Sequence, residues 1–175
     1  PTAYLTREAW LQGVPFYVDE RTIIPRSFIA ELIAEGSLEP WLPVADGPFK
    51  VLDLCTGNGS LAVLAALAWP QAQVHACDLS ADALAVARIN VDRHGLAARI
   101  TLAQGDCLAA APGRFDLILC NPPYVNAASM ADLPPEFRAE PALALAGGVD
   151  GMDFVRGLLA RAGAHLEPHG ALVLE

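Results

Sequence analysis

The chain has 175 residues, of which 54% are hydrophobic and 18% are charged. This composition excludes an intrinsically disordered chain, and the length suits a single domain. The chain has eleven basic and twenty acidic residues, and the resulting net charge of −9 disfavours binding to DNA or RNA. The longest purely apolar stretch, Leu61 to Trp69, is much shorter than the roughly 20 residues that span a bilayer. We therefore expect no direct nucleic-acid binding and no membrane insertion.

Short β-type runs alternate with longer helical runs from residue 49 onward. Strands are predicted at 49–55, 73–77, 99–103, 115–120 and 171–175, the last after a turn at 168–170. Helices are predicted at 60–69, at 153–166, and between an N-cap Ser80 and a terminating Gly95. Leu84, Ala87 and Val91 form the apolar stripe of the helix after Ser80. The alternation predicts an α/β fold with a doubly wound, mostly parallel sheet.

The first predicted strand runs into a glycine-rich loop, D-L-C-T-G-N-G, from Asp53 to Gly59. Gly57 and Gly59 allow backbone angles and a close approach of a ligand that a Cβ atom would prevent. The helix that follows directs its free N–H groups to the same place. Alone, the pattern also fits a simple tight turn, so its meaning depends on the neighbouring strand ends.

Acidic residues mark the ends of the next two strands as well. Asp78 comes nineteen residues after Gly59, where a carboxylate can accept hydrogen bonds from both hydroxyls of a ribose. Asp106 follows the third strand, in position to accept a hydrogen bond from an adenine amine. Each acid alone also fits a helix N-terminus or an exposed turn. Together with Asp53, the three acids indicate a pocket for an adenosyl group at the carboxyl ends of the strands.

The fourth predicted strand ends in Asn121-Pro122-Pro123-Tyr124. Each proline fixes its own φ angle, lacks an N–H group, and favours an extended conformation in the residue before it. The result is a rigid segment that presents carbonyl oxygens, an amide side chain and an aromatic ring. A structural turn would explain two prolines, but it explains the full tetrapeptide beside an adenosyl pocket much less well.

N-P-P-Y combined with D-x-x-x-G-x-G resembles the signature of S-adenosylmethionine-dependent methyltransferases that modify planar amine or amide nitrogens. Adenine-modifying DNA enzymes and protein glutamine methyltransferases share this signature. The stretches at 4–13, 16–27 and 132–151 favour the protein glutamine methyltransferases. Within that group, P-R-S at 25–27 together with Cys55 resembles the branch that acts on ribosomal protein uL3. The resemblance implies a class I methyltransferase, Rossmann-like core. It also implies S-adenosylmethionine as cofactor, a glutamine amide nitrogen as methyl acceptor, and a basic ribosomal protein as partner.

The resemblance assigns roles to individual residues. In the family, the asparagine side-chain oxygen and the carbonyl of the first proline accept the two N–H bonds of the glutamine amide. These roles fall to Asn121 and Pro122, while Tyr124 would stack on the amide plane. Pro123 and Arg26 are also expected at the acceptor site, and Glu140 and Pro141 are expected to shape the same loop. The expected cofactor-binding residues are Asp53, Cys55, Thr56, Gly57, Asn58, Gly59, Asp78, Asp106, Cys107 and Asn121.

Other interpretations remain open. The main alternative is a glutamine methyltransferase of peptide chain release factors, whose branch usually has P-R-P and a glycine in place of Cys55. An adenine-specific nucleic-acid methyltransferase would need a basic groove, which the net charge of −9 disfavours. A binding module without activity and a nicotinamide-dependent oxidoreductase are further alternatives. The four cysteines include no C-x-x-C pair, so we expect buried thiols, no metal site, and a cytoplasmic protein.

The family fold has seven strands in the order 3-2-1-4-5-7-6, whereas this sequence supplies five and stops inside the fifth. We therefore expect two regions: a lead-in segment and helix at 1–48 that border the active site, and a methyltransferase core at 49–175. The core is expected to lack the final two strands and to expose an apolar sheet edge beside the fifth.

Overall fold

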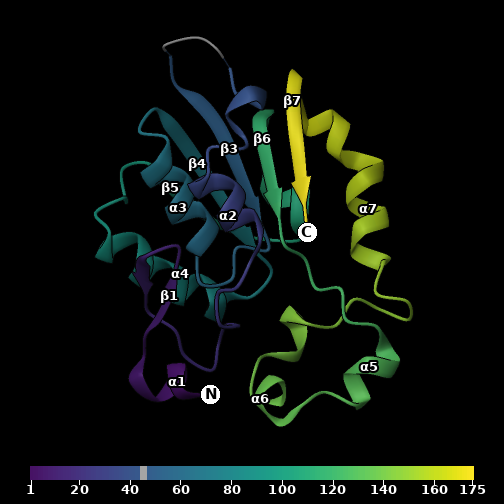
Figure 1. The fold of residues 1–175 in the computed structure, drawn as a ribbon. Helices are drawn as coiled ribbons and strands as arrows, with labels where there is room; N and C mark the ends of the chain where they lie inside the picture. The colour runs from purple at the N-terminus through teal and green to yellow at the C-terminus, as the bar shows by residue number, and fades with distance from the viewer. Residues whose placement is uncertain (44–46) are drawn as a thin grey trace.

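A five-stranded parallel sheet, in the order β5-β4-β3-β6-β7, forms the centre of the molecule (Figure 1). The computed structural model describes residues 1–43 and 47–175, so the part of the predicted lead-in segment at 44–46 lies outside the described residues. The strands of the sheet are β3 (Phe49–Leu54), β4 (Ala72–Asp78), β5 (Ile100–Gln104), β6 (Phe115–Cys120) and β7 (Leu166–Leu174). Counted within this sheet, the order is 3-2-1-4-5, which confirms the predicted doubly wound α/β fold.

Helices cover both faces of the sheet. The longer ones are α2 (Ile29–Ala34), α3 (Ser60–Ala68), α4 (Ala81–Arg93) and α7 (Asp153–Ala162), with short 3-10 turns at η1 (Glu39–Trp41), η2 (Cys107–Ala110), η3 (Ala142–Ala144) and η4 (Gly163–His165). Side chains of α2, α3 and α4 pack in one apolar cluster, and those of α7 and η2 pack in a second cluster. Alternate residues of a strand enter different clusters: Val51 joins the first, and Leu52 joins the second.

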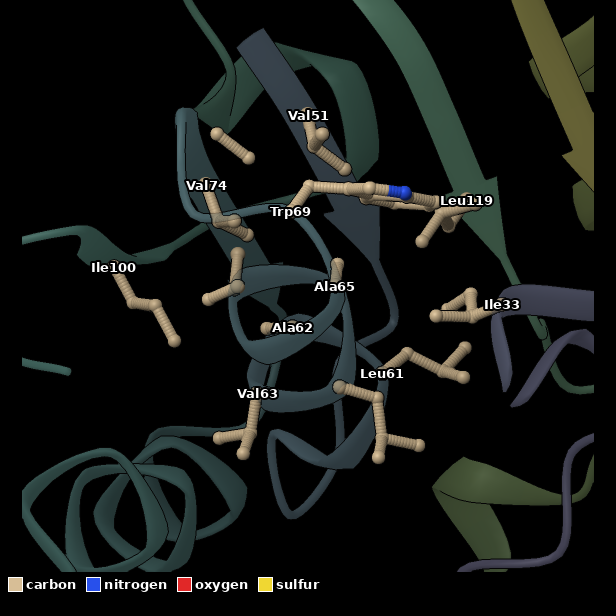
Figure 2. Packing of buried hydrophobic residues seen from close by; sticks show 14 of the residues in the cluster. Ile33, Val51, Leu61, Ala62, Val63, Ala65, Trp69, Val74, Ile100 and Leu119 are labelled. Carbon is tan, nitrogen blue, oxygen red and sulfur yellow. The ribbon is translucent and has the colours of Figure 1, made fainter. Parts of the chain in front are cut away.

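Helix α3 lies at the centre of the first cluster, as Figure 2 shows, and the side chain of Trp69 extends from its C-terminal end toward Leu119. Seven of its nine residues are buried, from Ser60 to Ala66. A helix that is apolar on all sides is typical of a protein interior. Because α3 is packed so tightly, the glycine-rich loop that leads into it has a fixed position at the carboxyl end of β3.

Two elements differ from their predicted form. Helix α4 has the predicted cap, in which the Ala83 N–H donates to Ser80 Oγ over 3.1 Å. However, its buried face is made of Ala83, Val86, Ala87, Asn90 and Val91, and Leu84 of the predicted stripe is only half-buried. The predicted helix at 153–166 ends at Ala162, because η4 tightens the chain before β7 begins. The polar Asn90 is the unexpected member of the buried face.

The fifth strand was predicted to begin at 171, after a turn at 168–170, whereas β7 begins at Leu166 and includes these residues. The chain is nevertheless tight at this point, since a Cβ on Gly170 would lie 3.0 Å from the Glu167 carbonyl oxygen. The pairing of β7 with β6 shifts between Phe115↔Leu166 and Leu117↔Ala171, so residues 168–170 lie in a bulge. A bulge can accept a proline because it leaves the backbone N–H of that position unpaired. Among the described residues β7 pairs with β6 alone, and the apolar side chains toward its end, Leu172, Val173 and Leu174, are half-buried.

Two smaller units lie at the carboxyl ends of the strands. The lead-in segment holds α1 (Thr2–Thr6) and an antiparallel hairpin of β1 (Ala9–Leu11) and β2 (Val14–Phe16). The second unit follows β6 and contains α5 (Ala127–Ala131) and α6 (Pro135–Arg138); in Figure 1 it lies beyond the arrowhead of β6. No helix in the described ranges is both long and apolar enough to cross a membrane.

Candidate active site

Two cavities lie at the carboxyl ends of the strands, and Asn121 lines both. The larger has a volume of about 450 Å³ and is bordered by the glycine-rich loop, the ends of β4 and β5, and part of the segment at 141–154. The smaller has a volume of about 270 Å³ and is bordered by the lead-in segment and by the chain that follows β6. Ile23 and Ala144 also line both cavities, so the two adjoin at these residues and at the Asn121 amide.

The glycine-rich loop brings backbone to the wall of the larger cavity. Gly57 has φ +56, and no atom lies within 4 Å of the point where a Cβ would stand, so this position is open to a ligand. Its N–H donates to Asp78 Oδ2 over 2.9 Å, which ties the loop to the end of β4. Gly59 has another purpose, because a Cβ there would lie 3.1 Å from the Ala87 Cβ of α4. Gly57 thus leaves the cavity wall open to a ligand, and Gly59 allows the loop to pack against α4.

Asp53 lies underneath this loop and does not line the larger cavity. Its Oδ2 accepts hydrogen bonds from Thr56 Oγ1 over 2.5 Å and from the Ala62 N–H over 3.1 Å. The side chain is fully buried, and this burial raises the pKa of the Asp53 carboxyl to about 7. Asp53 therefore holds the loop to the first turn of α3. Of the other expected cofactor residues, Thr56, Asn58 and Gly59 also lie outside the cavity wall.

The remaining expected cofactor residues do line the larger cavity: Cys55, Gly57, Asp78, Asp106, Cys107 and Asn121. Asp78 is half-buried, and its Oδ1 accepts from the Ser80 N–H over 2.9 Å. Desolvation raises the pKa of this carboxyl, although backbone N–H groups oppose the shift. Asp106 is exposed at the rim, and Cys107 beside it is buried. The cavity wall thus combines oxygen acceptors with an apolar surface.

All four cysteines are free thiols in one apolar region at this end of the sheet. Burial raises the pKa of Cys77 to about 12 and raises that of Cys107, so both thiols stay protonated at neutral pH. Within residues 1–43 and 47–175, no group of three or more Cys, His, Asp or Glu side chains is arranged to hold a metal ion. We therefore describe these cysteines as apolar wall and packing residues.

The tetrapeptide at 121–124 divides its residues between the cavities. Pro123 borders the larger cavity, whereas Pro122 and Tyr124 border the smaller one, where the Tyr124 side chain is half-exposed. Two glycines pack against this segment: a Cβ on Gly147 would lie 2.7 Å from Tyr124 Cα, and one on Gly151 would lie 2.3 Å from the Tyr124 carbonyl oxygen. The G-G-V-D-G sequence at 147–151 therefore lets a second segment press directly on the tetrapeptide backbone.

An ion pair joins Arg26, which lines the smaller cavity, to the buried carboxylate of Glu140. Arg26 donates from its two terminal nitrogens to the two carboxylate oxygens of Glu140, over 2.6 and 2.8 Å, and its guanidinium lies 5.0 Å from the centre of the Phe137 ring. Glu140 is only 6% exposed and also accepts the Ile24 N–H over 3.1 Å. Arg26 therefore lines the smaller cavity, and its terminal nitrogens are engaged by Glu140.

Arg21, Thr22 and Asn90 are among the residues of the site that sequence reasoning left without a role. Arg21 and Thr22 of the lead-in segment line the larger cavity. Asn90 is fully buried and exchanges hydrogen bonds with the backbone of Tyr17 over 2.7 and 3.0 Å, while its Nδ2 also donates to the Asn58 carbonyl over 2.8 Å. This amide links α4, the glycine-rich loop and the lead-in segment. In the sequence, Asn90 could have been found as a polar residue on the apolar face of a predicted helix.

The sheet order and the cavities at its carboxyl edge define the class I methyltransferase fold. A methyltransferase from Pyrococcus furiosus has the same fold, with a TM-score of 0.63 at 21% identity over 93% of this chain and 68% of that one. The SAM-dependent methyltransferase from Agrobacterium tumefaciens gives a TM-score of 0.56 at 25% identity, over 95% of this chain and 51% of that one.

The chain belongs to the methyltransferase small domain family, whose model matches residues 40–148. It is also 56% identical, over its whole length, to the ribosomal protein uL3 glutamine methyltransferase of Burkholderia pseudomallei. The chain spans 59% of the length of that relative. The match to the family thus covers the glycine-rich loop, the strand-end acids and the tetrapeptide at 121–124.

Proposed function

We propose that this protein transfers a methyl group from S-adenosylmethionine to the side-chain amide nitrogen of a glutamine in ribosomal protein uL3. The observation that carries the proposal is the position of Asn121, which lines both a cavity suited to an adenosyl cofactor and a second cavity beside it. The family membership and the 56% identity to a uL3 glutamine methyltransferase support the same reaction.

The residues of the larger cavity fit S-adenosylmethionine by their chemistry. Asp78 offers carboxylate oxygens to the ribose hydroxyls, and Asp106 offers an acceptor to the adenine amine. Cys55 and Cys107 supply apolar surface, and Gly57 leaves room for close contact. Thr56, Asn58, Gly59 and the buried Asp53 act from behind the cavity wall by fixing the loop. The bound cofactor supplies a methyl group on a sulfonium ion, which is already strongly electrophilic.

The task of the protein is to prepare the acceptor nitrogen, whose lone pair is delocalised in a planar amide. The Asn121 side-chain oxygen and the Pro122 carbonyl would accept the two N–H bonds of the glutamine, and the Tyr124 ring would pack on its plane. Two acceptors hold the nitrogen at the junction of the cavities and favour a pyramidal nitrogen over the planar ground state. Orientation of this kind can contribute roughly 7–11 kcal/mol to lowering a barrier.

Ile23 and Arg26 of the lead-in segment border the acceptor cavity, and Pro123 borders the larger cavity beside it. Arg26 acts as a positioning residue, because its pair with Glu140 fixes the loop that covers the smaller cavity. The net charge of −9 would favour a highly basic ribosomal protein as the substrate and would disfavour nucleic acid. A substrate of this kind implies a cytoplasmic site of action.

Mass spectrometry of the reaction products tests the proposal. The chain is incubated with isotopically labelled S-adenosylmethionine and, separately, with unmethylated uL3, an unmethylated release factor and adenine-containing DNA. We expect one labelled methyl group on a glutamine of uL3 and none on DNA. Label on the release factor alone would replace uL3 as the substrate, and label on DNA or on no acceptor would contradict glutamine methylation.

A further inference from the structure

The larger cavity has one basic residue in its wall, in contrast to its three aspartates. Arg21 lines the cavity together with Asp78, Asp106 and Asp153. An adenosyl group needs acceptors and no cation, so the adenosyl portion of a ligand does not account for this arginine. The observation points to an anionic group at the lead-in side of the cavity.

The guanidinium of Arg21 is held in place by a buried carboxylate. Its Nε and Nη2 donate to Asp19 over 2.9 and 2.6 Å, and the Asp19 side chain is 4% exposed. Arg7 also lies 3.5 Å from Asp19, so two arginines share one carboxylate and the group carries a net positive charge. Among the described residues, Nη1 of Arg21 has no hydrogen-bond partner, and the side chain remains 38% exposed. Arg21 can therefore donate to a ligand without leaving Asp19.

The neighbouring Thr22 gives an independent sign of a missing ligand. Its Oγ1 is buried and has no hydrogen-bond partner in the described part of the chain, although the residue lines the same cavity. The backbone of Thr22 is fixed, since its N–H donates to the Asp19 carbonyl and its own carbonyl accepts the Tyr4 hydroxyl over 2.6 Å. A buried hydroxyl without a partner is costly, so this one is expected to bond a ligand.

The segment that carries both residues is anchored on either side. Asn90 ties Tyr17 to the Asn58 carbonyl of the glycine-rich loop, and Glu140 binds the Ile24 N–H and Arg26. Residues 17–26 thus run from the glycine-rich loop to the loop that covers the acceptor cavity. Arg21 and Thr22 lie between these anchors in the chain and line the larger cavity.

We propose that Arg21 and Thr22 form a carboxylate subsite that holds the α-carboxylate of the amino-acid portion of the cofactor. The inference rests on the proposed function, because it assumes S-adenosylmethionine in the larger cavity. Arg21 Nη1 and Thr22 Oγ1 both donate to the carboxylate, and Asp19 positions the guanidinium. The subsite fixes the end of the cofactor remote from adenine.

Calorimetry with two ligands tests the subsite without relying on turnover. S-adenosylhomocysteine carries the α-carboxylate, whereas 5′-methylthioadenosine lacks the amino-acid portion. We expect Arg21→Gln to raise the Kd of S-adenosylhomocysteine about 10- to 100-fold, the loss typical of a charge-assisted hydrogen bond, and to leave the Kd of 5′-methylthioadenosine unchanged. Thr22→Val should raise the Kd of S-adenosylhomocysteine about 10-fold and leave that of 5′-methylthioadenosine unchanged. The thermal stability of the free protein should stay the same or increase. Arg93→Gln, at an exposed ion pair with Glu8, is the matched control and should change neither Kd.

The outcomes separate the subsite from the proposed function. Arg21→Gln could raise the Kd of both ligands equally, or change neither. Either result would overturn the carboxylate subsite while leaving cofactor binding intact. Failure of the unaltered protein to bind either ligand would instead overturn the proposed function and the subsite with it.

Discussion

The buried carboxylates of Asp53 and Glu140 are stabilised in opposite ways. Asp53, under the larger cavity, bonds to Thr56 and Ala62, three and nine residues away in sequence, and no cation contributes to its environment. Glu140, beside the smaller cavity, bonds to Ile24 and Arg26, 116 and 114 residues away. Asp53 is therefore held by local contacts at one strand end, whereas Glu140 depends on an ion pair between distant segments.

This difference predicts that substitutions on the acceptor side and on the cofactor side have distinct effects. A change on the acceptor side should alter the use of the glutamine substrate and leave cofactor binding intact. A change under the glycine-rich loop should alter the stability of the sheet and the binding of cofactor. A change at Asn121 should affect both sides, because Asn121 lines both cavities, as Ile23 and Ala144 do.

The largest effect is expected for Asn121→Ala. Loss of one acceptor for the reacting amide should lower the rate of methyl transfer about 100- to 1,000-fold, the cost typical of removing a hydrogen-bond partner that acts in the transition state. Labelled methyl incorporation under saturating cofactor measures this loss. Asn126→Ala is the matched control, because Asn126 caps α5 through the Ser129 N–H and lines neither cavity. A variant that retains full transfer would contradict the role assigned to Asn121.

The next effect concerns the ion pair on the acceptor side. Glu140→Gln keeps the shape of the side chain and removes the charge that holds Arg26, so the free energy of unfolding should fall by about 1.5–3 kcal/mol. The KM for the protein substrate should rise, while the Kd for S-adenosylhomocysteine stays constant. Urea denaturation, substrate titration and calorimetry measure the three quantities.

Asp150→Asn provides the control for this prediction. Asp150 also pairs with an arginine, Arg156, but both side chains are more than half exposed. Its loss should therefore change the free energy of unfolding by no more than about 1 kcal/mol. Equal effects of the two substitutions, or a matching loss of cofactor binding in Glu140→Gln, would refute the separation of the two sides.

The same difference explains how far the sequence could predict the molecule. Strand ends, the glycine-rich loop and the cap at Ser80 follow from patterns within about ten residues, and the structure has them where they were predicted. The pairing of Arg26 with Glu140, the link made by Asn90 and the placement of Arg21 depend on contacts between distant segments. No local pattern specifies such contacts, so sequence reasoning named Arg26 and Glu140 without their pairing and gave Arg21 no role. The irregularity at 168–170 was predicted as a turn, but the start of β7 at Leu166 was missed because a proline and a glycine together are typical of a strand boundary.

The third effect is a pH dependence that belongs to Asp53. The pKa of its carboxyl is raised to about 7 in the folded chain, because burial disfavours the charged form. In the unfolded chain the pKa of an aspartate is about 4, so between these values the folded state holds one proton that the unfolded state has lost. The stabilisation from this group is complete below about pH 4 and is lost as the pH rises through 7. Its contribution to the free energy of unfolding should fall by about 1.4 kcal/mol for each pH unit between 5 and 6.

Asp53→Asn removes this titration and keeps a side chain that can accept from Thr56. Urea denaturation at pH 5, 6 and 8 should show the free energy of unfolding of the variant rising relative to that of the unaltered protein as the pH increases. Asp19 is a suitable internal comparison, because the Arg21 ion pair lowers its pKa to about 2 and its titration therefore falls outside this range. If the difference between the two proteins does not change with pH, Asp53 is ionised like an ordinary carboxylate. The local hydrogen bonds from Thr56 and Ala62 would then suffice to hold a buried charge, and the contrast with Glu140 would be one of sequence distance alone.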